Sequence, residues 1–516
     1  MNVMTEIKTT ATRLLLLVGV FLSLEGWAHD EHRNDGIFRH SVTTEKKPWA
    51  VKKLNKTQLV QFRAGAACVD VTPTVFPIQL RSGKSNYVHD PLHVRAVAFE
   101  RGEGRAVICL IDAIGIGRDM SDLAKARAAE KTGWKTEEML ICATHTHSAP
   151  KGGEGTPGKE AYEKLKHEKL EEAIVKAIQA LQPARVGFGS DEEPSEVRNR
   201  RWFLEPGTMP PNPLGELDQV KTNAGRNDLI KPAGPTDPEI CVIDVRTNRH
   251  KPLALIANYA LHYVGGIPKV KEEDGRLVGM ASADYFGEFS RVMPYRIGGS
   301  NPPEGFVALM TNGASGDINN LVFTGTRAPR SPFEQVRIVA SKAADTAWRA
   351  VKKIEDYDNK PLVSVLQREV DLPYRKPAKR EIILAEGLLK KSSKERNEIN
   401  KRTTSVANRV IEYSNPDHPE TEPVLIQAVR IGEQAIVSMP FEVLVEIGLQ
   451  IKQKSPFERT FLIELANGGY GYLPPPNQHK LGGYETWLGT SRFQPQSSDL
   501  LIKRLLEMLE DLKKLK

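Results

Sequence analysis

The most informative stretch of this 516-residue chain is Ile141-Cys142-Ala143-Thr144-His145-Thr146-His147-Ser148-Ala149-Pro150. Its apolar start predicts a buried strand, and the proline marks a point where that strand has ended. Alternation along a strand would place His145 and His147 on one face. A lone histidine is usually a satisfied polar residue. Two histidines at the end of a core strand, where α/β active sites gather, instead suggest a metal ligand and an acid/base partner.

A second apolar run, residues 253–261, leads directly into His262. Two predicted strands are therefore each followed directly by a histidine. A zinc ion that performs chemistry keeps three or four nitrogen and oxygen ligands and an exchangeable water, so a carboxylate is expected nearby. The candidates are Asp284, Asp317 and Glu442. Glu442 follows a predicted strand that turns at Pro440 into a helix, and the alternative for it is a first-turn glutamate favoured by the helix dipole.

The rest of the chain alternates between strand and helix patterns without a clean boundary. A predicted hairpin joins residues 94–99 to 106–112 by a turn at 102–104, after a first strand at 65–71. Helical periodicity occurs at 121–132, 160–182, 332–355, 379–413 and 497–515, and strand-like runs occur at 253–262, 306–311, 361–372 and 424–439. This pattern predicts one large α/β domain over residues 58–516, with mixed β-sheets covered by helices.

Two segments stand out within that domain. Residues 203–236 are rich in Pro, Gly and Asn, and so long a loop in a compact domain is more often functional than idle, which suggests a lid or pocket wall at the mouth of the site. Residues 379–413 are highly charged and end before a proline, which predicts a solvated surface helix.

The N-terminus has the pattern of an export signal. Two basic residues precede the apolar run 14–24, and small residues at Gly26 and Ala28 suit a cleavage site. We predict a signal peptide over 1–28, a flexible lysine-rich leader over 29–57 and a periplasmic or extracellular mature chain. The alternative, a membrane anchor, is weaker because the run is about half as long as a span requires.

Composition excludes several classes of protein. Hydrophobic residues make up 40% and charged residues 27%, as in soluble globular proteins. The net charge of +7 is spread along the chain without an arginine cluster, so it points away from nucleic acid and weakly towards anionic surfaces or substrates. The four cysteines lie in apolar runs and are predicted core residues, neither disulfide-bonded nor spaced as metal ligands.

Several features in this order resemble the catalytic domain of the neutral/alkaline non-lysosomal ceramidase family. Besides the two histidine motifs they are Ser282-Ala283-Asp284, Gly316-Asp317, Pro440-Phe441-Glu442 and Gly469-Tyr470-Gly471-Tyr472. The resemblance spans roughly residues 62–495. It implies that zinc is held by two histidines, a glutamate and a tyrosine, which correspond to His145, His262, Glu442 and Tyr472. It also implies that His147, Arg200 and Tyr484 surround the scissile amide.

The resemblance thus implies an exported zinc-dependent amidohydrolase that cleaves an N-acyl compound with metal-activated water. Arg200 and Tyr484 would stabilise the oxyanion, and His147 would pass a proton to the leaving amine. Since Arg201 adjoins Arg200, either arginine is equally well a plain surface charge. The implied substrate is a small molecule or lipid, with peripheral contact to membrane lipids. The oligomeric state is not determined by the sequence.

Some residues depart from the family's pattern. Asn319 stands where the family has a serine after Gly-Asp, and Ser315 lacks the spacing of a nucleophile elbow. Residues 473–476 are Leu-Pro-Pro-Pro where ceramidases have threonines and glutamates. The chain ends in a predicted amphipathic helix, so we expect it to lack the family's C-terminal immunoglobulin-like domain. The alternatives are a zinc esterase or other hydrolase on the same scaffold, and a secreted binding protein without catalysis.

Overall fold

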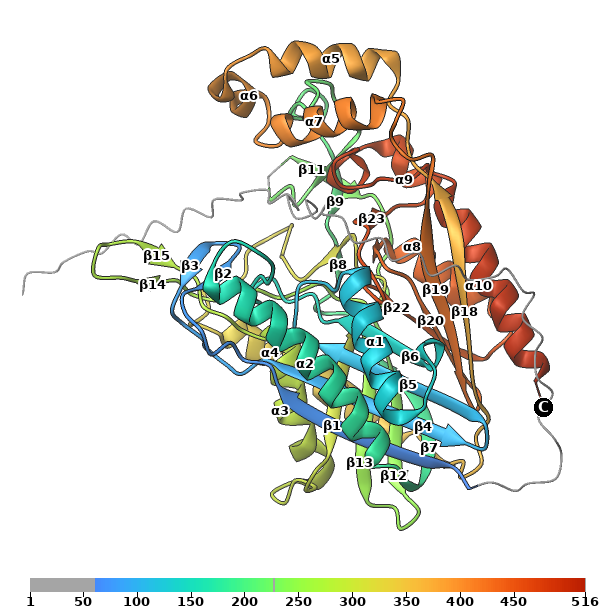
Figure 1. Cartoon of the computed structure of the whole chain (residues 1–516). Coiled ribbons are helices and arrows are strands. Elements are labelled where there is room, and N and C mark those ends of the chain that lie inside the picture. Colours follow the sequence, from blue (N-terminus) through green and yellow to red (C-terminus); the bar gives the residue numbers. More distant parts are fainter. Residues whose placement is uncertain (1–60, 226–227, 516) are drawn as a thin grey trace, which may run out of the picture.

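The computed structural model describes residues 61–225 and 228–515, so the predicted signal peptide and leader lie outside the described residues. Two β-sheets pack face to face, and helices cover their outer faces (Figure 1). The predicted mixed α/β class is confirmed. The larger sheet has the spatial order β16 (Val307–Asn312), β13 (Pro252–Tyr259), β12 (Glu239–Thr247), β7 (Gln182–Glu192), β1 (Arg63–Asp70), β4 (His93–Arg101), β5 (Gly104–Ile111), β6 (Met139–Ala143).

The smaller sheet has the order β18 (Val363–Pro373), β19 (Thr421–Ile431), β20 (Gln434–Ser438), β22 (Arg459–Ile463). Alternation along β19 explains the layers. Val429 and Ile431 face the larger sheet and pack with Val97 of β4, whereas Val424 and Ile426 face outwards to the helices. Both sheets are therefore buried on two faces, as their almost continuous apolar strands require.

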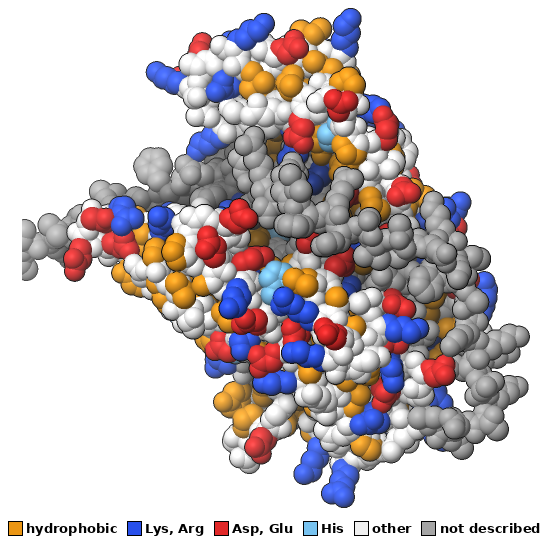
Figure 2. All heavy atoms as spheres, in the orientation of Figure 1, with side chains coloured by type: hydrophobic (Ala, Val, Ile, Leu, Met, Phe, Trp, Pro, Cys, Tyr) orange, Lys and Arg blue, Asp and Glu red, His pale blue; other side chains and the backbone are white. Residues whose placement is uncertain are grey.

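Helices complete the outer layers. The larger sheet is covered by α1 (Arg118–Thr132), α2 (Pro157–Gln179), α3 (Asp284–Gly298) and α4 (Glu334–Lys352), and the smaller by α8 (Val445–Lys454) and α10 (Ser497–Lys514). None of the helices among the described residues is long and apolar enough to cross a membrane. On the face drawn in Figure 2, acidic and basic side chains of the described residues are interspersed rather than gathered in one basic area.

The prediction of one helix over 379–413 is wrong. The segment forms three helices, α5 (Lys379–Leu389), α6 (Ser393–Ile399) and α7 (Thr403–Ser414), which project from the sheets at the top of Figure 1. Ser392 starts a new helix because its side chain accepts a hydrogen bond from the backbone N–H of Glu395, and extended backbone at Asn400 ends that helix. Capping residues thus divide this segment into separate helices, although its charged pattern is continuous.

The remaining elements are short and lie mostly around the ends of the strands. They are β2 (Ile78–Leu80), β3 (Gly83–Ser85), η1 (Thr136–Glu138), β8 (Arg198–Asn199), β9 (Arg201–Leu204), β10 (Val220–Thr222), β11 (Leu229–Pro232), β14 (Val270–Lys271), β15 (Leu277–Val278), β17 (Ile318–Asn319), β21 (Glu442–Val443), β23 (Tyr472–Leu473), α9 (Pro476–Leu481) and η2 (Tyr484–Thr486). The stretch 203–236, predicted as a loop, contributes to the small sheet β10-β9-β11.

The segment 464–467, after β22, links opposite edges of the larger sheet. The backbone N–H of Glu464 donates to the carbonyl of Asn312 at the end of β16 (3.1 Å), and the N–H of Ala143 at the end of β6 donates to the carbonyl of Leu465 (3.2 Å). These bonds join the carboxyl ends of the two edge strands. Loops that follow β6 and β13 therefore meet at one place, although their strands are far apart in the sheet order.

Candidate metal centre

Three histidines converge where these loops meet. The Nε2 atom of His145 lies 3.0 Å from Nε2 of His262 and 3.0 Å from Nε2 of His147. His145 and His262 are completely buried, and His147 is half-buried. The ligand atoms of this trio lie within 4.8 Å of one another, so the group could hold a metal ion. The structure thus brings together the imidazoles that the two apolar runs deliver.

The predicted reason for the alignment of His145 and His147 is wrong. The strand β6 ends at Ala143, before either histidine, so strand alternation does not apply to them. Instead His145 adopts a φ of 67°, in the left-handed region that few non-glycine residues occupy. Such backbone persists only where the surroundings enforce it, and it is common at functional sites.

The Nδ1 atoms of His145 and His262 face backbone carbonyls. The Nδ1 of His145 donates to the carbonyl of Ile114 (2.6 Å), and that of His262 donates to the carbonyl of Ser315 (3.1 Å). A carbonyl only accepts, so in the neutral rings Nδ1 carries the proton and Nε2 presents a lone pair. Burial, His145 and Arg200 hold the pKa of His262 well below its usual range, which favours the neutral, metal-binding form.

His147 has the opposite polarity. Its Nδ1 lies 2.9 Å from Nη1 of Arg81, and a guanidinium only donates, so Nδ1 is the acceptor. The proton of the neutral ring is therefore on Nε2, the atom that faces His145. His147 thus presents an N–H to the cluster, whereas His145 and His262 present lone pairs. Sequence reasoning missed Arg81, which lies in the turn between β2 and β3 and has no periodic signal.

Glu442 is the carboxylate that reaches the cluster. Its Oε2 lies 3.4 Å from Nε2 of His145 and 3.7 Å from Nε2 of His262. The prediction that it begins a helix is wrong, because Glu442 lies in β21 and helix α8 starts only at Val445. The strand β21 pairs in parallel with β23, and this register places Glu442 directly beside Tyr472.

The other two candidate carboxylates hold loops. Asp284 accepts hydrogen bonds from the backbone N–H groups of Val264 and Gly265, and so fixes the turn after His262. Asp317 accepts from the N–H of Val445 at the start of α8 and from the side chain of Asn199. Burial raises the pKa of Asp284 and of Asp317 to about 6 in each case.

Tyr472 lies beside Glu442 and contacts Arg200. The Nη2 of Arg200 donates to the hydroxyl of Tyr472 (3.0 Å), and its Nε donates to Glu485 (2.9 Å). Burial and the charge of Glu442 raise the pKa of Tyr472 well above its usual range, although Arg200 opposes this. Arg201 instead bonds Glu485, Gln478 and the carbonyl of Gly482.

The two adjacent arginines therefore differ in what they contact. Arg200 faces the cluster through Tyr472, while Arg201 fastens the segment 478–485 to β9. The alternative of a surface charge is wrong for both, because Arg200 is 4% exposed and Arg201 is 0% exposed.

Tyr484, in η2, lies beside Tyr472. Its ring centroid is 5.4 Å from that of Tyr472, and the guanidinium of Arg402 lies over the Tyr484 ring at 4.9 Å. Burial raises the pKa of Tyr484 to about 12, so the hydroxyl keeps its proton. Arg402 is the N-cap residue of α7, and its place here could not be predicted from a segment that seemed wholly solvated.

Comparison with solved structures finds this architecture in ceramidase structures, whereas no family model and no curated protein matches the chain. A crystal structure of neutral ceramidase from Pseudomonas aeruginosa is 18% identical, with a TM-score of 0.64 over 88% of this chain and 75% of that chain. A ceramidase complexed with C2 is also 18% identical, with a TM-score of 0.65 over 88% of this chain and 76% of that one. The chain has the neutral ceramidase fold. The resemblance inferred from the ordered motifs is confirmed at the level of the fold.

Asn319, which replaces the family's serine, and the nearby Ser315 both make structural contacts. Ser315 is buried, its hydroxyl donates to Oε1 of Glu464 (2.6 Å) and its carbonyl holds His262. Asn319 pairs with Arg198 between β17 and β8, and its side chain accepts from the N–H of Leu321. Burial raises the pKa of Glu464 well above its usual range. Glu464 itself gave no signal in the sequence.

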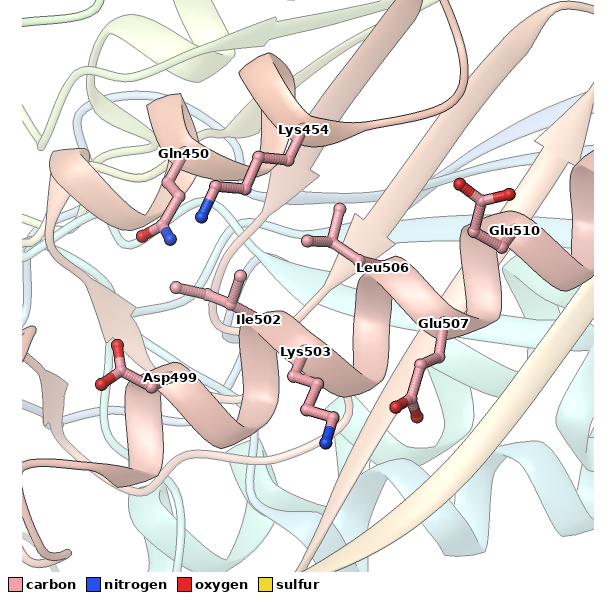
Figure 3. A pocket seen from close by; sticks show the side chains of 8 residues that line it. All are labelled: Gln450, Lys454, Asp499, Ile502, Lys503, Leu506, Glu507 and Glu510. Atoms are coloured by element: carbon pink, nitrogen blue, oxygen red, sulfur yellow. The ribbon is translucent and has the colours of Figure 1, made fainter.

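A hollow of about 500 Å³ lies away from this cluster, between α8 and α10 (Figure 3). Ile502 and Leu506 form an apolar strip there, with charged side chains such as Lys454 and Glu510 on either side. None of the residues that line it belongs to the histidine cluster or its neighbours. It offers neither a nucleophile nor a set of metal ligands.

Proposed function

We propose that the chain is an exported, zinc-dependent amidohydrolase that cleaves the amide bond of an N-acyl compound. The observation that carries this proposal is the pair of Nε2 lone pairs on His145 and His262, which face each other at 3.0 Å with Oε2 of Glu442 within 3.7 Å. Two lone pairs at this distance repel unless a cation lies between them. Nitrogen and carboxylate oxygen are the donors that zinc prefers, and the neutral ceramidase fold supports the proposal.

His145, His262, Glu442 and Tyr472 would hold the ion. When bound, zinc supplies Lewis acidity towards a carbonyl oxygen and lowers the pKa of a water. Arg200 and Tyr484 are both protonated and buried, and we assign them as donors to the oxygen of the scissile carbonyl.

His147 would transfer the proton. Hydrolysis moves a proton from the attacking water to the leaving nitrogen, and His147 lies at the half-buried edge of the cluster. While Arg81 donates to Nδ1, however, Nε2 already carries a proton and can only donate a hydrogen bond. To accept the proton of the attacking water on Nε2 and pass it to the leaving nitrogen, His147 must first carry its own proton on Nδ1, which requires Arg81 to release that atom. Arg81 therefore controls which ring nitrogen of His147 carries the proton.

The substrate that we propose is a small-molecule or lipid N-acyl compound, reached in the periplasm or outside the cell, with peripheral contact to membrane lipids. The apolar character of 473–476, beside Tyr472, leaves the identity of the amine open. A zinc esterase remains the second candidate, because the same donors would stabilise the oxyanion of an ester.

The test uses the chain expressed with its natural N-terminus, and it compares N-acylsphingosine, simple N-acyl amides and matched esters, each with and without a chelator. We expect amide hydrolysis that the chelator abolishes and added zinc restores. Hydrolysis of esters alone would favour the esterase. Hydrolysis that is indifferent to the chelator would refute the metal mechanism, and zinc binding without any hydrolysis would favour a binding protein.

A further inference from the structure

A small cavity opens beside His147, on the side of the ring that faces Arg81. Its volume is about 160 Å³, and its walls include Tyr263, Ile267 and Met280. The ring of Tyr263 stacks on that of His147, with 3.7 Å between the ring centroids and an angle of 17° between the ring planes. Sites for drug-sized ligands usually measure about 300–1,000 Å³, so this cavity suits a group of only a few atoms rather than a long alkyl chain.

The cavity is positively charged. Among the described residues that line it, Arg81 and Lys269 are basic and none is acidic. Lys269 lies just before β14, is exposed at the rim, and forms no ion pair with any residue of 61–225 or 228–515. Arg81 is half-buried and contacts Nδ1 of His147 at 2.9 Å.

The position of the cavity, beside His147, indicates which part of a substrate could enter the cavity. The Nε2 edge of His147 faces His145 and the proposed zinc ligands, whereas the Nδ1 edge faces Arg81 and the cavity. On the proposed function, on which this step rests, His147 passes a proton to the leaving nitrogen. A substituent on that nitrogen would extend past His147 into the cavity, which the His147 ring itself lines.

We propose that the amine released by this site carries an anionic group close to its nitrogen, which Arg81 and Lys269 bind. The substrate class is then an N-acyl amino acid or a similar N-acyl compound with a carboxylate or sulfonate, rather than an amide of an uncharged amino alcohol. Charge-assisted hydrogen bonds from a guanidinium and an ammonium are the recognition chemistry. The small volume limits the amine to a few atoms, and the cationic rim favours an anionic group on it.

The test compares N-octanoylglycine with N-octanoylethanolamine, which share the acyl chain and differ in a carboxylate against a hydroxymethyl group. We expect kcat/KM to be at least about tenfold higher for the acid, mostly through KM. In Lys269→Gln this preference should fall to about threefold or less, because kcat/KM for the acid falls, while Lys269→Arg keeps it. Lys271→Gln, which alters an exposed lysine two residues along that does not line the cavity, is the matched control.

Equal hydrolysis of both compounds, a preference for the alcohol, or an equal effect of Lys269→Gln on both would overturn the proposal and leave the hydrolase intact. If neither compound is hydrolysed, the proposed function is in doubt, and calorimetric binding of the same pair decides the inference separately. Binding of the acid about tenfold tighter than the alcohol, lost in Lys269→Gln, supports the anionic site. Equal affinity of the two compounds overturns it.

Discussion

His145 and His147 are separated by one residue, yet their Nδ1 atoms contact groups of opposite polarity, a carbonyl and a guanidinium. We therefore expect different losses from the two substitutions. His145→Ala should lower both zinc content and rate, because a lone pair of the cluster is lost. His147→Ala should leave zinc near one per chain and lower the rate by on the order of 10²- to 10⁴-fold, the usual effect of an acid/base group. Elemental analysis and kcat/KM measure the two effects, and zinc loss from His147→Ala alone would exchange the roles.

Ser315 provides a second test at this scale. Its backbone carbonyl lies 3.1 Å from Nδ1 of His262, and its hydroxyl donates to the buried Glu464 at 2.6 Å and lies 3.3 Å from the same Nδ1. Ser315→Ala should therefore retain hydrolysis within about tenfold, while it lowers the free energy of unfolding by about 1–3 kcal/mol, because a buried carboxyl loses a donor. Chemical denaturation measures the stability. A covalent acyl adduct on Ser315 in the unmodified protein, seen by mass spectrometry, would contradict this prediction and favour a serine nucleophile.

Single residues could be predicted only where the chain itself marks them. The sites of His145 and His262 can be predicted from the sequence, because each histidine follows an apolar run within a few residues. Tyr472 was accessible only through resemblance, since its place beside Glu442 depends on two-residue strands from distant segments. Arg81 and Glu464 depend on contacts across the fold, between residues far apart in the chain.

At the scale of elements, α1 carries an unusual residue. Lys125 is 2% exposed, and its Nζ has no hydrogen-bond partner among the described residues. Burial lowers the pKa of Lys125 to about 7. Between that value and the pKa of about 10.4 of an unfolded lysine, the unfolded chain binds a proton that the folded chain lacks. This group therefore makes the protein more stable as pH rises from about 7 to 10.

Lys125→Met should accordingly raise the free energy of unfolding at pH 7 by about 1–3 kcal/mol, because an unsatisfied polar group is removed from the core. The advantage should shrink as pH rises towards 10. Denaturant unfolding at several pH values measures this, with Lys164→Met on the exposed surface of α2 as the control, for which we expect a change within about 0.5 kcal/mol at every pH. A constant difference between Lys125→Met and the parent would mean that Lys125 is paired in the folded protein.

Elements with strong, uninterrupted periodicity were predicted well, and those with local breaks were not. The helix predicted at 160–182 corresponds to α2, and the predicted hairpin corresponds to β4 and β5, with Gly102 in the left-handed conformation that its turn needs. Helix α3 was missed because Pro294 interrupts its pattern. The prediction at 379–413 failed for the opposite reason, since capping residues do not disturb the charge pattern.

At the scale of the whole molecule, the proposed zinc ligands come from both sheets. His145 and His262 follow strands of the larger sheet, whereas Glu442 and Tyr472 follow β20 and β22 of the smaller one. This convergence could not be read from the sequence, because it depends on how segment 464–467 joins the two edges of the larger sheet. An ion at this point would tie the two layers together.

We therefore predict that zinc stabilises the whole fold. An ion that binds only the folded state adds RT ln(1 + [L]/Kd), or about 2.7 kcal/mol when free zinc is 100 times Kd. The melting temperature should be higher in buffered zinc than in a chelator, and His262→Ala should abolish this difference. His167→Ala, on α2 and outside the cluster, should keep it. Since calorimetry needs no substrate, the result is independent of the proposed reaction. An equal zinc effect in His262→Ala and the parent would place the metal elsewhere, because the loss of one of two lone-pair imidazoles must weaken this site.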